Sequence, residues 1–445
     1  MGFTKLRLAT ATKLARIAEI SRENPDFEIQ WLMPHYNEES LKGCFHELDG
    51  RKALGADGID KEKYGSELDT NVAQLIAKMK TMSYRPGPVR EVMITKEGKP
   101  GAMRPLGISN FEDKMVQLMT AKILAAIYEP TFRECSYGFR PGRSCHMAIK
   151  DLSSYLHVNP CSVVIDVDLQ NFFGTLSHEV LLDFLRQRIK DEVFLRYIVR
   201  MLRSGVLGDG ELRMTDEGSP QGNVASPILA NVYAHYAIDC WFQDVVKSHC
   251  QGRVEIFRYC DDMVICCQSA DDAKKIQKAL EGRLERFSLS LNLEKTKLVS
   301  FDRRAATRGL TQDTFDFLGF TFYLARTRSG RITTKVKTSR KRLRSKLRRV
   351  KDWVKANRHG NMIMLWKALC RRLEGHIRYF GVSFNSQSVS EFLEHSTMIF
   401  WKWMNRRSQK KSITWDEFKL FMAKFPLPRN KIYFPLFVLK PQSKI

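Results

Sequence analysis

Two adjacent aspartates between two apolar segments form the first arrangement in this chain that could support catalysis. Asp261 and Asp262 follow Cys260 and separate residues 254–259 from residues 263–267. Both flanking segments are rich in β-branched, aromatic and other apolar residues, which predicts two strands joined by a tight turn. Carboxylates at the tip of a buried hairpin repel each other, and a divalent cation would offset that repulsion. Asp-Asp is also ordinary turn chemistry, so the pair alone leaves both interpretations open.

A second Asp-Asp pair lies ten residues further on, in different surroundings. Asp271 and Asp272 follow Ser269 and precede the segment A-K-K-I-Q-K-A-L. Acidic residues just after a serine are typical of a helix N-terminus, where they face the positive end of the helix dipole. Apolar strands enclose only the pair at 261–262, which is therefore the better candidate for a metal site.

A third carboxylate comes from the segment S-V-V-I-D-V-D-L at 162–169. Asp166 and Asp168 are two residues apart, so their side chains share one face of the expected strand. Only one needs to reach the hairpin tip, and Asp168 is nearer the strand end. Three carboxylates from neighbouring strands would hold two Mg²⁺ ions about 3.5–4 Å apart. Such ions activate a hydroxyl and neutralise a leaving pyrophosphate, which is the chemistry of nucleotidyl transfer.

The composition indicates a globular protein with a polyanionic partner. Of 445 residues, 43% are apolar, and 73 Lys and Arg outweigh 49 Asp and Glu, for a net charge of +24. Nucleic acid is the first candidate for the partner. An anionic membrane is the alternative, and the lack of an apolar run of about 20 residues argues against it.

The N-terminus and the cysteines indicate a reduced, cytoplasmic protein. The sequence M-G-F-T-K-L-R-L-A-T lacks the apolar core of a signal peptide. Ten scattered cysteines include no C-x-x-C pair, so we expect packed thiols and neither a disulfide framework nor a cysteine-ligated zinc module.

The elements that would position the acids form an α+β pattern. Residues 1–90 are mostly of helical pattern, and a strand at 89–94 leads into a basic Gly/Pro turn at 95–107 that suggests a mobile flap. A helix is expected at 111–128, and a long helical region at 178–203. Strands and helices alternate through the middle of the chain.

The last third begins with a segment that resembles a strand, F-D-F-L-G-F-T-F-Y at 315–323. Residues 335–351 then contain ten Lys or Arg, while Leu343, Leu347, Val350 and Val354 keep helical spacing. This pattern predicts a basic helical domain with an inward apolar seam, and a charge run this dense favours contact with phosphate.

Several segments together resemble one enzyme family. R-Y-C-D-D-M-V-I is similar to the Y-x-D-D box of reverse transcriptases, and S-V-V-I-D-V-D-L-Q-N-F-F is similar to the strand that carries their other metal aspartate. R-P-L-G-I, S-Y-G-F-R-P-G-R-S, G-S-P-Q-G with S-P-I-L-A-N, L-N-L-E-K-T-K and F-L-G-F occur in the same order. Together they resemble the group II intron-like bacterial branch over about residues 90–325, and the basic helices extend the likeness to the thumb.

The resemblance implies roles for individual residues. Asp168, Asp261 and Asp262 would ligate two Mg²⁺ ions, for which Mn²⁺ could substitute, and the Leu169 carbonyl would assist. Phe173 would exclude a 2′-hydroxyl and so favour dNTPs, whereas Phe172 fits a plain core aromatic.

The resemblance also implies a substrate pocket and a nucleic-acid path. Lys96 and Arg104 would clasp the triphosphate, Gln221 would pack beside the incoming nucleotide, and Lys295 is a candidate general acid for the pyrophosphate, although a surface lysine is an equal alternative. The expected primer grip is Phe317, Leu318 and Gly319. The arginines and lysines expected to bind nucleic acid are Arg140, Arg143, Arg340, Lys341, Arg344 and Arg348.

The implied fold is a right-hand polymerase with an antiparallel-sheet palm. We expect an N-terminal extension and fingers at 1–160, a palm at 161–330 and a helical thumb at 331–445. The implied activity is RNA-directed DNA synthesis on a structured RNA, with a DNA or RNA primer and a cDNA product, in the bacterial cytoplasm. The alternative is a maturase that mainly binds intron RNA for splicing.

Three departures from the family pattern favour a domesticated enzyme, for example one that copies a noncoding RNA in antiphage defence. They are Gly174, Asn223 and Cys260, where relatives commonly have Asp, Gly and Ala. The chain also ends soon after the expected thumb, so no endonuclease extension is expected.

Overall fold

An antiparallel sheet of four strands, in the order β6-β7-β3-β8, carries the candidate acids. The computed structural model describes residues 2–95, 101, 103–208, 210–214, 217–218, 222–407 and 413–437, with side chains from residue 12. The strands of this sheet are β3 (Val163–Asp168), β6 (Val254–Tyr259), β7 (Asp262–Cys267) and β8 (Lys297–Ser300). The expected hairpin and its neighbouring strand are therefore confirmed.

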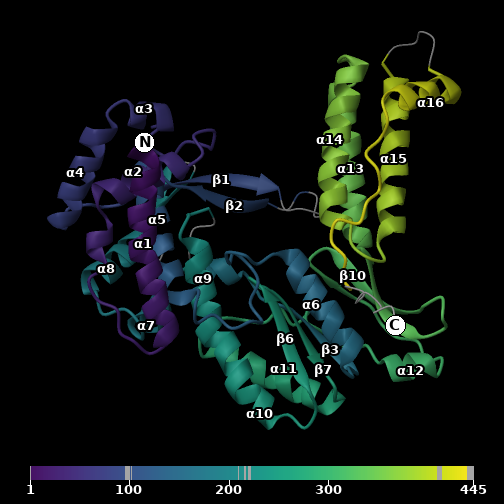
Figure 1. Ribbon diagram of the computed structural model, residues 1–445, viewed down its shortest axis with the longest axis horizontal. Helices are drawn as coiled ribbons and strands as arrows, with labels where there is room; N and C mark the ends of the chain where they lie inside the picture. Colours follow the sequence, from purple (N-terminus) through teal and green to yellow (C-terminus); the bar gives the residue numbers. More distant parts are fainter. Residues whose placement is uncertain are drawn as a thin grey trace, which may run out of the picture.

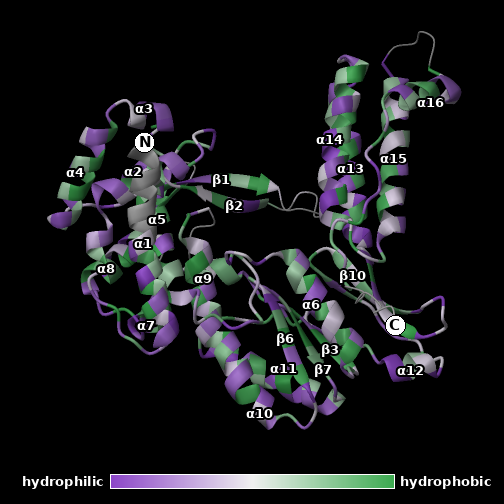
Figure 2. Ribbon diagram, viewed as in Figure 1, coloured by the Kyte–Doolittle hydropathy of each residue, from purple (hydrophilic) through white to green (hydrophobic). Residues whose placement is uncertain are grey.

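Both faces of this sheet are buried, and alternate residues pack into two different cores. Ile165 and Ile265 join a core formed with the N-terminal helices, whereas Val164 and Val264 join a core formed with the C-terminal helices. Figure 2 shows the strands of this sheet largely in the hydrophobic colour. Because side chains alternate with a period of two, the even-numbered acids of β3 and β7 lie on the same face as Val164 and Val264.

Amphipathic helices enclose the first core, on the side of the sheet away from the acids. They include α1 (Gly2–Glu23), α2 (Glu38–Glu47), α3 (Lys61–Gly65), α4 (Leu68–Lys80), α5 (Phe111–Tyr128), α7 (His178–Arg186), α8 (Glu192–Leu202), α9 (Ser226–Ala234), α10 (Lys247–His249) and α11 (Ala270–Glu285). The helical region expected at 178–203 is present as two helices, α7 and α8, with a break between them. Asp191 caps α8 by accepting a hydrogen bond from the Phe194 N–H at 3.0 Å, and so starts a new helix.

A second small sheet supports a projecting hairpin. β1 (Val89–Thr95) pairs antiparallel with β2 (Met103–Ile108), and the sheet is completed by β4 (Val206–Gly208) and β5 (Glu211–Arg213). The two strands expected here are confirmed, and most of the basic turn between them, including Lys96 and Lys99, lies outside the described residues. In Figure 1 this hairpin extends from the N-terminal helices towards α13 and α14.

The second core joins the acid-bearing face to the C-terminal part of the chain. Its elements are α6 (Cys145–Val158), β9 (Phe315–Phe317), β10 (Phe320–Arg326), β11 (Ile332–Thr338), α13 (Arg340–Asn357), α14 (Met362–Phe380), α15 (Ser386–Met404) and α16 (Trp415–Lys424), and α12 (Arg303–Thr307) lies before β9. Val350 and Val354 are buried, which confirms the apolar seam of the basic helix.

The segment 315–323 is not one strand but a hairpin of β9 and β10. Phe317 pairs with Phe320, and the two residues between them, Leu318 and Gly319, have φ values of 50° and 83°. Two consecutive positive φ values are the mark of a type I′ turn, which matches the twist of the strands it joins.

Across the part of the chain that the structure describes, no helix is both long and apolar enough to span a bilayer.

Candidate active site

The strand register brings three carboxylates to one end of the central sheet. Asp168, the last residue of β3, pairs directly with Asp262, the first residue of β7. Tyr259 and Asp262 close a two-residue turn made of Cys260 and Asp261, so Asp261 lies at the tip beside them. Asp166 pairs with Val264, one step further from the tip. The geometry thus brings together the three residues predicted as metal ligands.

Burial and mutual repulsion raise the pKa values of three carboxylates at this end of the sheet, Asp166, Asp261 and Asp262. Removal from solvent, together with the charges of Asp166 and Asp261, raises the pKa of Asp262 to about 7. Burial and the neighbouring Asp316 and Asp168 raise the pKa of Asp166 to about 6. The pKa of Asp261 is also raised, chiefly by desolvation. A cation among them would relieve the same repulsion.

Lys295 neutralises Asp168 in the structure. Its Nζ lies 2.6 Å from Asp168 Oδ2. The segment that carries Lys295 runs along the end of β3, where the Asn292 N–H donates to the Asp168 carbonyl at 2.8 Å. Leu169 lies opposite Leu291 in an isolated antiparallel bridge. Its two hydrogen bonds are donated by the Asn292 and Gln170 N–H groups to the carbonyls of Asp168 and Ser290, so the Leu169 carbonyl takes no part in the bridge.

The donor set fits a hard divalent cation. Carboxylate and carbonyl oxygens are the ligands that Mg²⁺ prefers, and this end of the sheet offers no soft sulfur ligand except the Cys260 thiol, whose pKa is raised to about 12 by burial. Within the described residues, no three potential ligands already converge on one point. The Asp168 carboxylate pairs with Lys295 instead, so a metal ion would have to compete with that ammonium.

The raised pKa values predict a pH-dependent effect of Mg²⁺ on stability. The folded-state pKa values of Asp262 and Asp166 lie above the unfolded value of about 3.9, so their contribution to the free energy of unfolding is greatest below pH 4 and falls as the pH rises to about 7. Protons and metal compete for the same oxygens. Mg²⁺ should therefore raise the melting temperature more at pH 8 than at pH 5.5, as measured by thermal unfolding. Equal shifts at both pH values, or an unchanged shift in Asp262→Asn, would contradict the assignment.

The predicted nucleotide-binding segments meet beside these acids. Phe173 is half-buried in a short 3₁₀ turn, η2 (Phe172–Gly174), whereas Phe172 is only 2% exposed and belongs to the core, as expected. A Cβ on Gly218 would come within 2.9 Å of the Gly174 carbonyl oxygen, so the G-S-P-Q-G loop starts against this turn.

The same loop ends against β2. Gly222 has φ 116°, and a Cβ there would lie 2.2 Å from the Gly107 carbonyl oxygen, so only glycine permits this approach. Arg104, also on β2, is exposed, and its charge partly offsets the rise in the Asp261 pKa that burial causes. The remaining predicted substrate ligands, Lys96 and Gln221, lie outside the described residues.

The predicted primer grip contacts a catalytic candidate directly. The Leu318 N–H donates a hydrogen bond to the Asp262 carboxylate, which partly offsets the rise in the Asp262 pKa. The Leu318 carbonyl accepts a hydrogen bond from the Tyr379 hydroxyl of α14 at 3.0 Å. Phe317 is 1% exposed, so it anchors the turn rather than reaching a ligand.

Comparison with known proteins decides the family. The family described as "Reverse transcriptase (RNA-dependent DNA polymerase)" matches residues 94–322, which is half of the chain and includes all three carboxylates. The chain belongs to the reverse transcriptase family.

The similar proteins are mostly associated with introns. Group II intron-encoded protein LtrA of Lactococcus lactis subsp. cremoris is 32% identical over 228 residues, covering 51% of this chain and 37% of LtrA. Protein YkfC of Escherichia coli K12 is 30% identical over 313 residues, covering 63% of this chain and 78% of YkfC. An uncharacterized 91 kDa protein in the cob intron of Schizosaccharomyces pombe is 36% identical over 200 residues, 45% of this chain and 24% of that protein. This reverse transcriptase thus spans little more than a third of LtrA.

The basic residues expected to bind nucleic acid fall into two groups. On α13, four cations are exposed and line a groove of about 760 Å³ together with Lys337: Arg340, Lys341, Arg344 and Arg348. The expectation for Arg140 is wrong. Its side chain is 5% exposed, and it pairs with Glu129 at 2.8 Å and donates to the Ser136 and Arg133 carbonyls. Arg143 pairs with Glu134 and lies over the Tyr137 ring.

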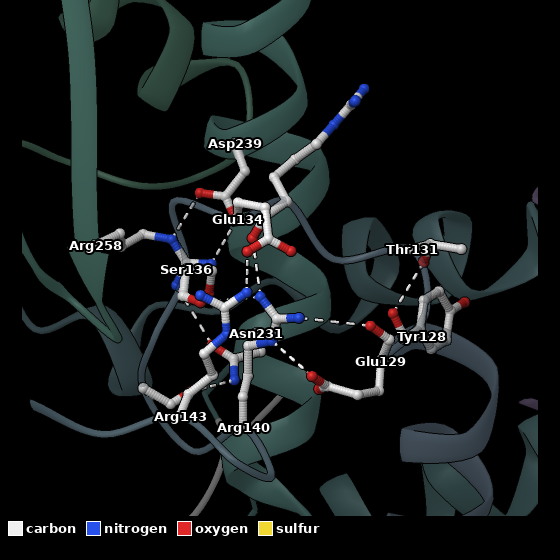
Figure 3. Close-up of polar contacts among 12 residues, drawn as sticks. Tyr128, Glu129, Thr131, Glu134, Ser136, Arg140, Arg143, Asn231, Asp239 and Arg258 are labelled. Carbon is white, nitrogen blue, oxygen red and sulfur yellow. Dashed lines mark hydrogen bonds and ion pairs between the residues drawn. The ribbon is translucent and has the colours of Figure 1, made fainter. Parts of the chain in front are cut away.

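A buried charge network that the sequence did not predict lies behind the 260–262 turn. Arg258 and Asp239 are both fully buried and form an ion pair (Figure 3). Each is a charge with apolar or aromatic neighbours in sequence, Arg258 between Phe257 and Tyr259 on β6 and Asp239 after Ala237 and Ile238 in the helical segment that follows α9. An isolated charge in an apolar run was the available signal, because such a charge needs a partner.

The three departures from the family pattern have local explanations. Cys260 adopts φ 60° in the turn, and its thiol is buried. The Asn223 Oδ1 accepts a hydrogen bond from the Ala225 N–H at 2.8 Å, which glycine could not do. A side chain at Gly174 would collide with Asn171, because a Cβ would lie 2.3 Å from Asn171 Nδ2.

Proposed function

We propose that this reverse transcriptase is an RNA-directed DNA polymerase that acts by two-metal nucleotidyl transfer. The observation that carries the proposal is the register that sets Asp168 opposite Asp262, with Asp261 in the adjoining turn. Asp168, Asp261 and Asp262, with the Leu169 carbonyl, would hold two Mg²⁺ or Mn²⁺ ions. When bound, the two ions would lower the pKa of the primer 3′-hydroxyl and neutralise the leaving pyrophosphate.

The other residues would position the substrates. Arg104 and Lys96 would bind the triphosphate, the arginine by paired hydrogen bonds, and Gln221 would pack by the incoming nucleotide. Leu318 and Gly319 would hold the primer end, since their turn already touches Asp262. Lys295 would release Asp168 on metal binding and donate a proton to the pyrophosphate.

The proposed architecture is a right hand, with fingers at 1–160, palm at 161–330 and thumb at 331–445. The hairpin of β10 and β11 crosses the last boundary, so the helical part of the thumb begins with α13 at 340. In Figure 1 the β1–β2 hairpin and α13–α15 stand on opposite sides above the central sheet, as fingers and thumb would.

Primer extension tests the proposal. The purified chain, an RNA template with an annealed DNA primer, dNTPs and Mg²⁺ should yield DNA complementary to the RNA. No product, or product whose sequence ignores the template, would overturn the proposal.

Phe173→Ala should increase the use of rNTPs. If the ring blocks a 2′-hydroxyl, its removal should raise the ratio of rNTP to dNTP incorporation by about tenfold or more, since a steric contact is worth about 1–3 kcal/mol. Competition assays with a single nucleotide measure the ratio. Phe172→Leu is the matched control, because this core change should lower the melting temperature without changing selectivity. An unchanged ratio in Phe173→Ala would remove this residue from the nucleotide site.

A second candidate function is intron RNA binding for splicing, with polymerisation secondary. The exposed cations of α13 and the intron-encoded relatives support it. Splicing that persists when Asp261 and Asp262 are replaced by alanine, but fails when 340–351 is neutralised, would favour this function. The absence of an intron around the gene would rule it out.

The template is proposed to be a structured cognate RNA. Sequencing the RNA and DNA that co-purify with the protein separates two biological settings. Intron lariat would assign the enzyme to intron mobility. A short structured transcript with its complementary DNA would assign it to a domesticated role such as antiphage defence.

A further inference from the structure

We infer that Arg258, held by Asp239 and Asn231, is a positioning residue that sets the geometry of the Cys260–Asp261 turn and thereby the affinity of the site for metal. The inference rests on the proposed function of Asp261 and Asp262. Arg258 is 0% exposed, so it contacts neither solvent nor nucleic acid, despite the strongly basic character of the chain.

All five N–H donors of the Arg258 guanidinium have partners, of which Asp239, Ser136 and Asn231 are labelled in Figure 3. Nε and Nη2 bind the two carboxylate oxygens of Asp239, the former at 2.7 Å. Nη2 also donates to Ser136 Oγ at 2.7 Å, and Nη1 donates to Asn231 Oδ1 at 3.3 Å and to the Cys260 carbonyl at 3.0 Å. Lysine has only three donors, so it could not replace these contacts.

The last of these bonds reaches the catalytic turn. The Cys260 carbonyl belongs to the peptide that leads into Asp261, so the guanidinium fixes the plane from which that carboxylate projects. Cys260 has φ 60°, a conformation that is unfavourable for a non-glycine residue and needs support from its surroundings. The hydrogen bond from Arg258 provides that support.

A neighbouring loop, residues 135–138, packs against the same turn. Residues 135–137 pair with Arg258 through backbone hydrogen bonds of 2.8 and 2.9 Å. A Cβ on Gly138 would lie 2.4 Å from Cys260 Sγ and 2.7 Å from Cys260 N, so the loop packs tightly on the turn. Asn231 Nδ2 donates to the Gly138 carbonyl at 2.7 Å while its Oδ1 accepts from Arg258. The Asn231 amide thus ties the loop and the guanidinium together.

A local change of helix type places both partners of Arg258. Asn231 lies on α9 and Asp239 ends the π-helical segment η3 (His235–Asp239), which follows α9 directly. Asn231 and Asp239 are eight positions apart. In a regular α-helix this step makes about 2.2 turns, so the two side chains would point in different directions. A π-turn takes up an extra residue, so the rotation falls closer to two full turns and both side chains face Arg258.

Arg258 and the residues around it lie in three separate segments that carry the family resemblance. Ser136 and Gly138 belong to S-Y-G-F-R-P-G-R-S, Asn231 to S-P-I-L-A-N and Arg258 to R-Y-C-D-D. The buried Arg258 side chain therefore connects two segments, around Ser136 and Asn231, that are more than 90 residues apart in sequence. It joins both of them to the turn that bears Asp261. The Lys247–Glu255 ion pair, at 2.8 Å, is a matched comparison, because Glu255 lies on the same strand, β6, but pairs with Cys266, away from the 260–262 turn.

The test compares two double variants that each remove a whole ion pair of β6. Arg258→Met with Asp239→Leu deletes the bond to the Cys260 carbonyl without leaving an unpaired buried charge, a change that is often tolerated. Lys247→Met with Glu255→Leu, at the other end of the strand, is the control. The Mg²⁺ concentration that gives half-maximal primer extension should rise about 10- to 100-fold in the first variant and stay unchanged in the second, as expected when support for a metal ligand is lost. Affinity for RNA should be unchanged in both.

Two further measurements keep the inference separate from the proposed function. The Mg²⁺-induced rise in melting temperature reports metal binding without catalysis, and it should shift to higher Mg²⁺ in the first variant even if no polymerase activity is found. Arg258→Lys keeps the charge next to Asp239 and should show an intermediate shift, which also serves if the double variant does not fold. An unchanged Mg²⁺ dependence in Arg258→Lys or in the folded double variant would overturn the inference, whatever happens to the rate.

Discussion

Replacing Asp261 and Asp262 together by asparagine should lower the rate of primer extension on RNA by about 10³-fold or more. The metal pair contributes several kcal/mol of charge stabilisation in the transition state, and each 1.36 kcal/mol is a factor of ten in rate. Asparagine keeps the size of the side chain and can still bond to the Leu318 N–H, but it carries no charge to hold a metal ion. The rate is measured in single-turnover extension of a labelled primer.

The second Asp-Asp pair of the chain provides a matched control. Asp271 is exposed at the start of α11, where its neighbour Ser269 caps the helix. Asp271→Asn should therefore leave the rate within about twofold, because it removes one surface charge. Both variants should bind RNA as the parent does. Residual extension above a few per cent in the Asp261→Asn, Asp262→Asn variant would mean that catalysis lies elsewhere.

Neutralising the exposed face of α13 should weaken RNA binding by about 10- to 100-fold at 0.2 M salt. Arg340, Arg344 and Arg348 follow one another at intervals of four, so they form one stripe along the groove of about 760 Å³. Each phosphate contact contributes about 0.7–0.9 to the slope of log affinity against log salt. Changing all three to glutamine should reduce that slope by about 2 to 3, as measured by equilibrium binding over a salt series.

The same number of charges can be removed elsewhere as a control. Lys274, Lys275 and Lys278 are exposed on α11, which packs on the opposite face of the central sheet. Their replacement by glutamine lowers the net charge equally but should leave the salt slope nearly unchanged. If both triple variants weaken binding alike, the affinity depends on net charge and not on the α13 groove.

The grouping of the carboxylates at one end of the sheet could be predicted from the sequence because a strand has a simple period. Two-residue spacing put Asp166 and Asp168 on one face, and proximity to the strand end selected Asp168, which the structure indeed pairs with Asp262. The apolar seam of α13 could be predicted for the same reason, since Val350 and Val354 keep helical spacing. Both are local patterns, and tertiary contacts did not change them.

Other features depended on contacts between distant segments. Arg140 lies in a glycine-rich loop with a second arginine, and nothing local distinguishes a phosphate ligand from a side chain that turns inward to Glu129. Arg258 and Asp239 each carried the signal of a lone charge among apolar residues, but the sequence does not state which charges meet. Two breaks within expected elements had local signals, namely Gly319 within the apolar run at 315–323 and Asp191 before Glu192, which are typical of a turn and of a helix start.

Iron-mediated cleavage of the polypeptide tests the central claim most directly, because it locates the bound metal without relying on activity. Fe²⁺ replaces Mg²⁺ in a site of oxygen ligands, and the radicals that it generates with ascorbate and peroxide cut the nearby backbone. The account predicts fragments that end near residue 168 and near residues 260–262, suppressed by excess Mg²⁺ and lost in Asp262→Asn but not in Asp271→Asn. Cleavage at other positions, or the same fragments in Asp262→Asn, would contradict it.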